Sequence, residues 1–122
     1  MKRILLVDDD PAVTALIAAR LSKQFEVYSV HDPRQAVRVA ASIAPDVIFC
    51  DVDMPDMNGG EVAVALAANA QTAAIPLVYL TALVTPEEIP DIGGMVSGRP
   101  ALSKRAPLAE LVRAIEKACG GS

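Results

Sequence analysis

The amino-acid sequence predicts an α/β domain in which five parallel strands form a doubly wound sheet. Short apolar runs of strand length recur along the chain, and helix-length segments separate them. The composition is 52% hydrophobic but only 3% aromatic, as in parallel-sheet proteins whose helices carry small residues. With 122 residues the chain is long enough for one core and too short for two, so residues 1–122 are expected to form a single domain of helices around one sheet.

The expected elements alternate from strand to helix along the chain. The five strands are expected at Ile4–Val7, Val27–Val30, Val47–Cys50, Leu77–Leu80 and, more weakly, Ala101–Leu102. The helices are expected at Pro11–Lys23, from Pro33 to about Ile43, from about Gly60 to Ala70, and at Leu108–Cys119. Asp10 and Asp32 each precede a proline and are expected to cap the first two helices. This alternation implies right-handed crossovers and helices on both faces of the sheet.

The stretch Thr85–Pro100 interrupts this alternation. It holds three prolines and three glycines in sixteen residues, so a helical turn is plausible only around Pro86–Ile89. We expect a loop here, or a much shortened fourth helix.

Charge and cysteine content exclude several classes of function. The net charge of −4, from 11 basic and 15 acidic residues, leaves no broad basic surface for nucleic acid. Cys50 and Cys119 lie far apart and fit no CxxC pattern, which favours a reducing compartment and makes the cytoplasm the expected location. No apolar stretch approaches the length of a membrane span.

Polar side chains gather where the expected strands end, which is where open parallel sheets bind ligands. The strands are followed by Asp8, Asp9 and Asp10, by Asp51 and Asp53, by Thr81 and by Lys104. If the first and third strands are neighbours, two carboxylates about 4 Å apart would repel by about 4 kcal/mol at an effective dielectric constant of about 20. Mg²⁺ would relieve this repulsion, because it takes carboxylate and carbonyl oxygens and can bridge to a phosphoryl group.

Thr81 and Lys104 add groups that complement a phosphoryl group. The hydroxyl could donate to one phosphoryl oxygen and the ammonium could pair with another, which leaves the third for the metal. Together these residues would bind a phosphoryl group on Asp51.

The whole set of motifs resembles the receiver domain of two-component response regulators, the CheY-like proteins. The resemblance covers almost the whole chain and rests on LLVDDDP with Asp8 and Asp9, DVDMPDMNG with Asp51, YLTA with Thr81, and LSKRAPLAELVRAI with Lys104. It implies a flavodoxin-like sheet of strand order 2-1-3-4-5, with the fourth helix shortened or replaced by a loop.

The resemblance also implies a role for each site residue. Asp51 would accept a phosphoryl group from the phosphohistidine of a histidine kinase or phosphotransfer protein. Asp9, Asp51 and the main-chain carbonyl of Asp53 would hold Mg²⁺, and Asp8 would act through water. Thr81 and Lys104 would contact the phosphoryl oxygens.

The same resemblance implies a signalling module rather than an enzyme, with at most self-phosphorylation from small phosphodonors and autodephosphorylation. Its partners would be the kinase or phosphotransfer protein upstream and a protein target downstream. A monomer or weak dimer is expected, with no direct contact to nucleic acid or membrane.

Two positions depart from the family pattern. Arg105 follows Lys104 where the family usually has proline, so the bond between them is either trans or held cis under strain. Ala101 stands where many receivers carry the aromatic residue that moves on phosphorylation.

Two alternatives follow. The chain could be a receiver that has lost phosphorylation and acts as an interaction module. It could also be a Mg²⁺-dependent phosphohydrolase, since DVD is similar to the paired aspartates of haloacid dehalogenase-like phosphatases. Those enzymes place this motif after the first strand, however, whereas Asp51 follows the third.

Overall fold

The computed structural model describes residues 1–52, 54–55, 57–82, 95–96 and 99–120. The strands are β1 (Arg3–Val7), β2 (Glu26–Val30), β3 (Val47–Asp51), β4 (Leu77–Thr81), β5 (Met95–Val96) and β6 (Arg99–Ser103). The helices are α1 (Pro11–Leu21), α2 (Ala36–Ile43), α3 (Gly59–Ala68) and α5 (Leu108–Ala118), with a 3₁₀ turn, η1 (Pro33–Gln35), before α2. None of these described helices combines the length and the apolar character that crossing a membrane requires.

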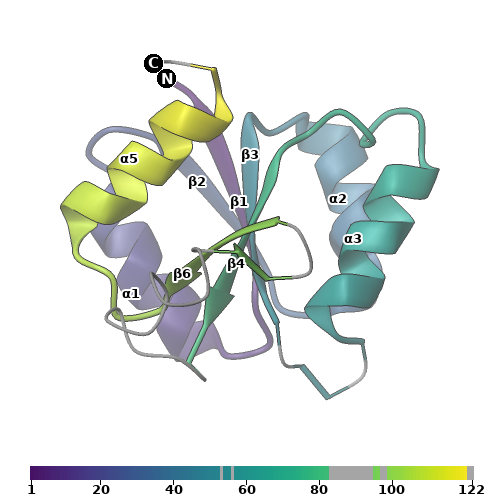
Figure 1. The fold of residues 1–122 in the computed structure, drawn as a ribbon, viewed down its shortest axis with the longest axis horizontal. Coiled ribbons are helices and arrows are strands. Elements are labelled where there is room, and N and C mark those ends of the chain that lie inside the picture. The colour runs from purple at the N-terminus through teal and green to yellow at the C-terminus, as the bar shows by residue number, and fades with distance from the viewer. Residues whose placement is uncertain (53, 56, 83–94, 97–98, 121–122) are drawn as a thin grey trace.

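The sheet has the predicted flavodoxin-like topology. Its strand order is β2-β1-β3-β4-β6-β5, and the first five of these strands run parallel. Because β6 is the predicted fifth strand, the expected order 2-1-3-4-5 is confirmed. Helices α1 and α5 cover one face of the sheet, and α2 and α3 cover the other (Figure 1).

The core is divided by the sheet into two apolar clusters, and strand β1 shows how the sequence builds both. Leu5 and Val7 pack into the cluster on the α2 and α3 side, whereas Ile4 and Leu6 pack into the cluster on the α1 and α5 side. This alternation follows from the two-residue period of a strand. Every residue of β3 and β4 is buried, which explains why their sequences are continuously apolar up to Asp51 and Thr81.

Side chains that accept backbone hydrogen bonds set the starts of the helices. An Asp10 carboxylate oxygen accepts the N–H of Ala12 at 2.9 Å, so the predicted cap of α1 is confirmed. Asp32 accepts the N–H of Arg34 at 3.0 Å and caps the 3₁₀ turn η1, whereas α2 itself begins only at Ala36. Asn58 and Glu61 exchange two such bonds, which starts α3 at Gly59, one residue earlier than expected.

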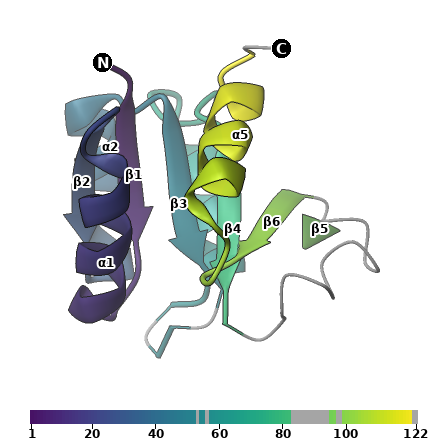
Figure 2. The same cartoon turned by 90° about the vertical axis from the view of Figure 1, so that its left-hand side faces the viewer.

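The stretch Thr85–Pro100 contains a feature that its composition did not predict. Residues 83–94 and 97–98 lie outside the described residues, so the predicted loop or short helix there stays a prediction. Met95–Val96 and Arg99–Pro100 form strands that pair antiparallel at the edge of the sheet (Figure 2), so the expectation of a loop is wrong for them. Pairing between segments outweighs the local preference of prolines and glycines for loops.

Candidate functional site

The register of the central strands brings the first and third strand ends together. Val7 pairs with Cys50 in the parallel ladder, so the residues that follow them, Asp8 and Asp51, come next to each other at the carboxyl edge of the sheet. Both side chains are buried, with Asp8 4% and Asp51 5% exposed, while Asp9 is exposed. The first and third strands are therefore neighbours, as the predicted convergence of the acids requires.

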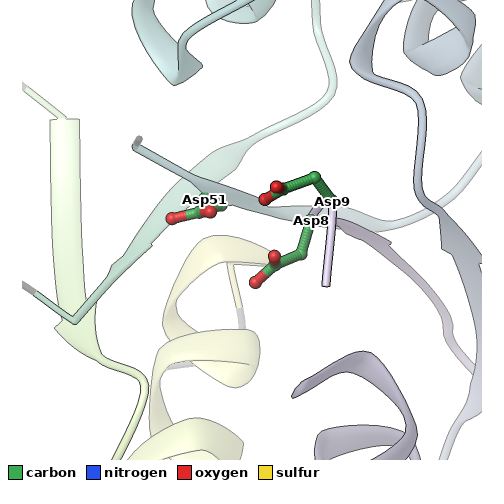
Figure 3. A group of neighbouring side chains, drawn as sticks. All are labelled: Asp8, Asp9 and Asp51. Atoms are coloured by element: carbon green, nitrogen blue, oxygen red, sulfur yellow. The ribbon is translucent and has the colours of Figure 1, made fainter. Parts of the chain in front are cut away.

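The three carboxylates form one group. Asp8, Asp9 and Asp51 each offer a carboxylate oxygen, and these three atoms all lie within 4.8 Å of one another. Figure 3 shows Asp8 and Asp9 on the segment after β1 and Asp51 on the neighbouring strand, with their carboxylates gathered in one place. Such crowding of negative charge is costly without a cation.

Lys104 supplies one positive charge to this group. Its Nζ lies 2.8 Å from Asp8 Oδ2 and 3.2 Å from Asp51 Oδ2, and its side chain is 15% exposed. Burial alone would lower the pKa of the Lys104 ammonium, but the contacts with Asp8 and then Asp51 outweigh burial and raise the pKa. Lys104 therefore stays charged across the neutral range and holds two of the three carboxylates together.

The negative charge at this edge of the sheet exceeds what Lys104 compensates, which favours a further cation. Asp8 Oδ1 accepts the N–H of Asp10 at 3.0 Å, and Asp8 Oδ2 pairs with the Lys104 ammonium at 2.8 Å. Three carboxylates against one ammonium give a formal charge of 1 − 3 = −2. Hard oxygen donors with excess negative charge are the ligands that Mg²⁺ prefers, so these residues fit the expected metal.

Thr81 occupies the end of the next strand. It is 4% exposed, and it follows Leu80, the residue that pairs with Asp51 between β3 and β4. The small residue Ala82, which comes after it, is exposed. Asp53, the remaining predicted metal ligand, lies outside the described residues.

The peptide bond after Lys104 is trans. No cis peptide bond occurs in the described part of the chain, which includes Lys104 and Arg105. Of the two possibilities that the sequence left open, the structure thus has the unstrained one, and Lys104 still reaches both acids. The hydroxyl oxygen of Ser103 accepts the Arg105 N–H at 3.0 Å. The sequence analysis had not singled out Ser103. A signal was present, because a serine hydroxyl can accept the N–H two residues later, and Arg105 has an N–H where a proline was expected.

Ala101 and Tyr79 form a buried pair between β6 and β4. Ala101 is 3% exposed and pairs with Tyr79, which is 2% exposed, so the one aromatic ring of this strand pair comes from β4 rather than β6. Both belong to the cluster that α2 and α3 cover.

Cys50 precedes the expected phosphoacceptor and is fully buried, as predicted. Burial first, and then the charges of Asp51 and Asp8, raise the pKa of its thiol to about 12. The Cys50 thiol therefore remains protonated and packs as a small apolar group.

Gly59 lies against the backbone of the expected phosphoacceptor, a contact that the sequence analysis had missed. Its N–H donates to Val52 O at 2.9 Å, and a Cβ added to it would lie 2.5 Å from the Asp51 carbonyl oxygen. Only glycine fits there, because no side chain can approach a backbone oxygen so closely.

Comparison with known proteins gives a consistent result. The family model for the response regulator receiver domain matches residues 4–116. Protein PilH of Pseudomonas aeruginosa is 35% identical over 82 residues, which make up 66% of this chain and 68% of PilH. The transcriptional regulator RpaA of Synechocystis is 36% identical over 84 residues, 68% of this chain, but the chain spans only 35% of the length of RpaA.

A solved structure resembles the fold over nearly its full length. The receiver domain of the sensor histidine kinase PA1611 from Pseudomonas aeruginosa has a TM-score of 0.80 and 28% identity, and the match covers 98% of each chain. That domain was solved with a magnesium ion coordinated in its active-site cleft.

Proposed function

Since the chain belongs to the family of response regulator receiver domains, we propose that it accepts a phosphoryl group on Asp51 from the phosphohistidine of a histidine kinase or phosphotransfer protein. The observation that carries this proposal is the placement of Lys104 Nζ between Asp8 and Asp51, 2.8 and 3.2 Å from their Oδ2 atoms. An ammonium this close to the Asp51 carboxylate can pair with the anionic group that the transfer would add there.

The proposed transfer is a substitution at phosphorus. A carboxylate oxygen of Asp51 attacks the phosphorus atom, the P–N bond to the histidine breaks, and its electron pair leaves with the imidazole nitrogen. The product is an acyl phosphate. The Lys104 ammonium would pair with one phosphoryl oxygen, and the hydroxyl of Thr81 would donate a hydrogen bond to another.

The metal that we propose for this site is Mg²⁺. Asp9, Asp51 and the main-chain carbonyl of Asp53 would hold it, and Asp8 would act through water. Support comes from the three carboxylate oxygens within 4.8 Å of one another and from their excess of negative charge over the single Lys104 ammonium that contacts the group. When bound, Mg²⁺ would neutralise charge on the phosphoryl oxygens and on the acids.

We propose that the phosphorylated chain signals by binding a protein target, as a signalling module and not as an enzyme with a substrate of its own. Ala101 provides no aromatic ring on β6 that could move, so the signal would pass by some change other than the rotation of a ring at this position.

Intact-mass spectrometry tests phosphorylation directly. The protein is incubated with Mg²⁺ and acetyl phosphate, and the expected result is a gain of one phosphoryl group in the unmodified sequence but none in Asp51→Asn. Asp10→Asn is the matched control, because it makes the same change beside the site and asparagine caps a helix as well as aspartate does.

Other outcomes would decide against the proposal. If the unmodified sequence gains no mass and binds no Mg²⁺, the chain is an interaction module that works without phosphorylation. Sustained turnover of unrelated phosphomonoesters would instead favour a phosphohydrolase.

A further inference from the structure

We propose that Ser103 is a positioning residue for Lys104: its hydroxyl fixes the trans Lys104–Arg105 peptide in the turn that directs the lysine ammonium onto Asp8 and Asp51. The geometry stands by itself, while its consequence for phosphoryl transfer rests on the proposed function. Arg105 stands where the family usually has proline, and its backbone N–H, which a proline would lack, needs an acceptor.

Ser103 lies at the start of the turn that carries Lys104. It is the last residue of β6, it pairs with Thr81 in the parallel ladder, and it is 1% exposed. Its hydroxyl oxygen accepts the Arg105 N–H at 3.0 Å, and its carbonyl oxygen accepts the Ala106 N–H at 3.0 Å. Ser103 therefore closes both hydrogen bonds of the turn that contains Lys104.

Contacts from outside the turn fix its two sides. The Lys104 N–H donates to Thr81 O at 3.0 Å, which ties the start of the turn to β4. From α1, Arg20 Nη2 donates to Ala106 O at 3.2 Å, which ties its end. Between these anchors, only the peptide of Arg105 remains to be held, and the Ser103 hydroxyl holds it.

The position of the ammonium depends on this turn because the lysine side chain is long and has many rotamers. Its Nζ meets two carboxylates at 2.8 and 3.2 Å only if its Cα and backbone direction are fixed. If the Arg105 N–H lost its acceptor, it would turn toward water, since a backbone donor needs a partner. The peptide that carries Lys104 would rotate with it.

Competitive labelling of lysine amines tests this placement without relying on phosphorylation. At limiting acylating reagent, the label on Lys104 is measured by peptide mass spectrometry relative to the exposed Lys2, Lys23 and Lys117. Ser103→Ala is expected to raise the relative labelling of Lys104 about fivefold, the factor that corresponds to one ordinary hydrogen bond. Ser103→Thr, which keeps a hydroxyl, is expected to leave it unchanged. Ser42→Ala on α2 is the matched control at an exposed serine.

Amide hydrogen exchange gives a second readout that a general loss of stability would not reproduce. The Arg105 amide is expected to exchange faster in Ser103→Ala than in Ser103→Thr, while core amides of β3 stay equally protected. Unchanged labelling of Lys104 in Ser103→Ala would overturn the proposal, and so would a rise that comes with a loss of protection at the β3 amides, because that would mean a loosened fold.

The rate of phosphorylation by acetyl phosphate separates this inference from the proposed function. It should fall about fivefold in Ser103→Ala and recover in Ser103→Thr. If Lys104 labelling changes as expected but the unmodified sequence takes up no phosphoryl group, the positioning role stands and the proposed function fails.

Discussion

The acidic and the basic halves of the site are held in place by different means. Asp8 and Asp51 follow directly from the register of β1 and β3, which are buried strands in the middle of the sheet. Lys104 instead comes after β6, which pairs with β4 at only three positions and has the two-residue strand β5 as its other neighbour. The acids are thus fixed by the sheet, whereas the lysine is fixed by the hydrogen bonds of one turn.

This difference implies that the two halves can be altered separately. A change in the turn after β6 should move the ammonium and leave the acids in place. A change against β3 should disturb the acids and cost stability, because the strand belongs to the core of the domain.

The substitution expected to break the acidic half most severely is Gly59→Ala. Its Cβ would lie 2.5 Å from the Asp51 carbonyl oxygen, 3.0 Å from Val52 Cα and 3.1 Å from Tyr79 Cε1, so either α3 or β3 must shift. Overpacking of this kind costs about 2 kcal/mol, which urea unfolding would measure.

Gly60→Ala is the matched control for this prediction. Among the described residues, a Cβ there meets only Asn58 Oδ1 at 3.2 Å within 4 Å, and alanine is favoured over glycine inside a helix. Equal losses of stability in the two variants would contradict the close approach of Gly59 to Asp51.

The substitution Lys104→Met tests the basic half of the site. The ammonium and a divalent cation compete for the same carboxylates, so removing the ammonium should tighten Mg²⁺ binding, by about tenfold, or about 1.4 kcal/mol. Isothermal titration would measure the dissociation constant, with Lys117→Met at an exposed site as the control. Weaker binding in Lys104→Met would show that Lys104 supports the metal site instead of competing with it.

The smallest expected effect concerns the thiols. Burial raises the pKa of the Cys50 thiol to about 12, and it also raises the pKa of the half-buried Cys119 thiol. At a pH below these pKa values, both side chains are mainly protonated thiols, which react slowly with alkylating reagents. Because Cys50 is fully buried, iodoacetamide at pH 8 should label Cys119 first and reach Cys50 only after unfolding in urea. Rapid labelling of Cys50 in the native protein would mean that the acidic half opens.

The part of the site that could be predicted from the sequence is the part that the sheet dictates. The apolar runs before Asp8 and Asp51 identified buried parallel strands, and the acids at their ends followed from the strand order. The turn at Ser103 was not predicted, because the sequence left the isomer of the peptide after Lys104 open and because the turn depends on a side chain that accepts a backbone N–H two residues later. The pairing of β5 with β6 was missed because contacts between segments leave little trace in local composition.

The central claim is that Asp51 carries the phosphoryl group, and chemical mapping of the modified residue tests it most directly. Borohydride reduces an acyl phosphate on aspartate to homoserine, so the protein is treated with Mg²⁺ and acetyl phosphate, reduced, digested and sequenced by mass spectrometry. The account predicts homoserine at position 51 and at no other aspartate. Homoserine at position 8 or 9, or at no position in a folded protein that binds Mg²⁺, would contradict it.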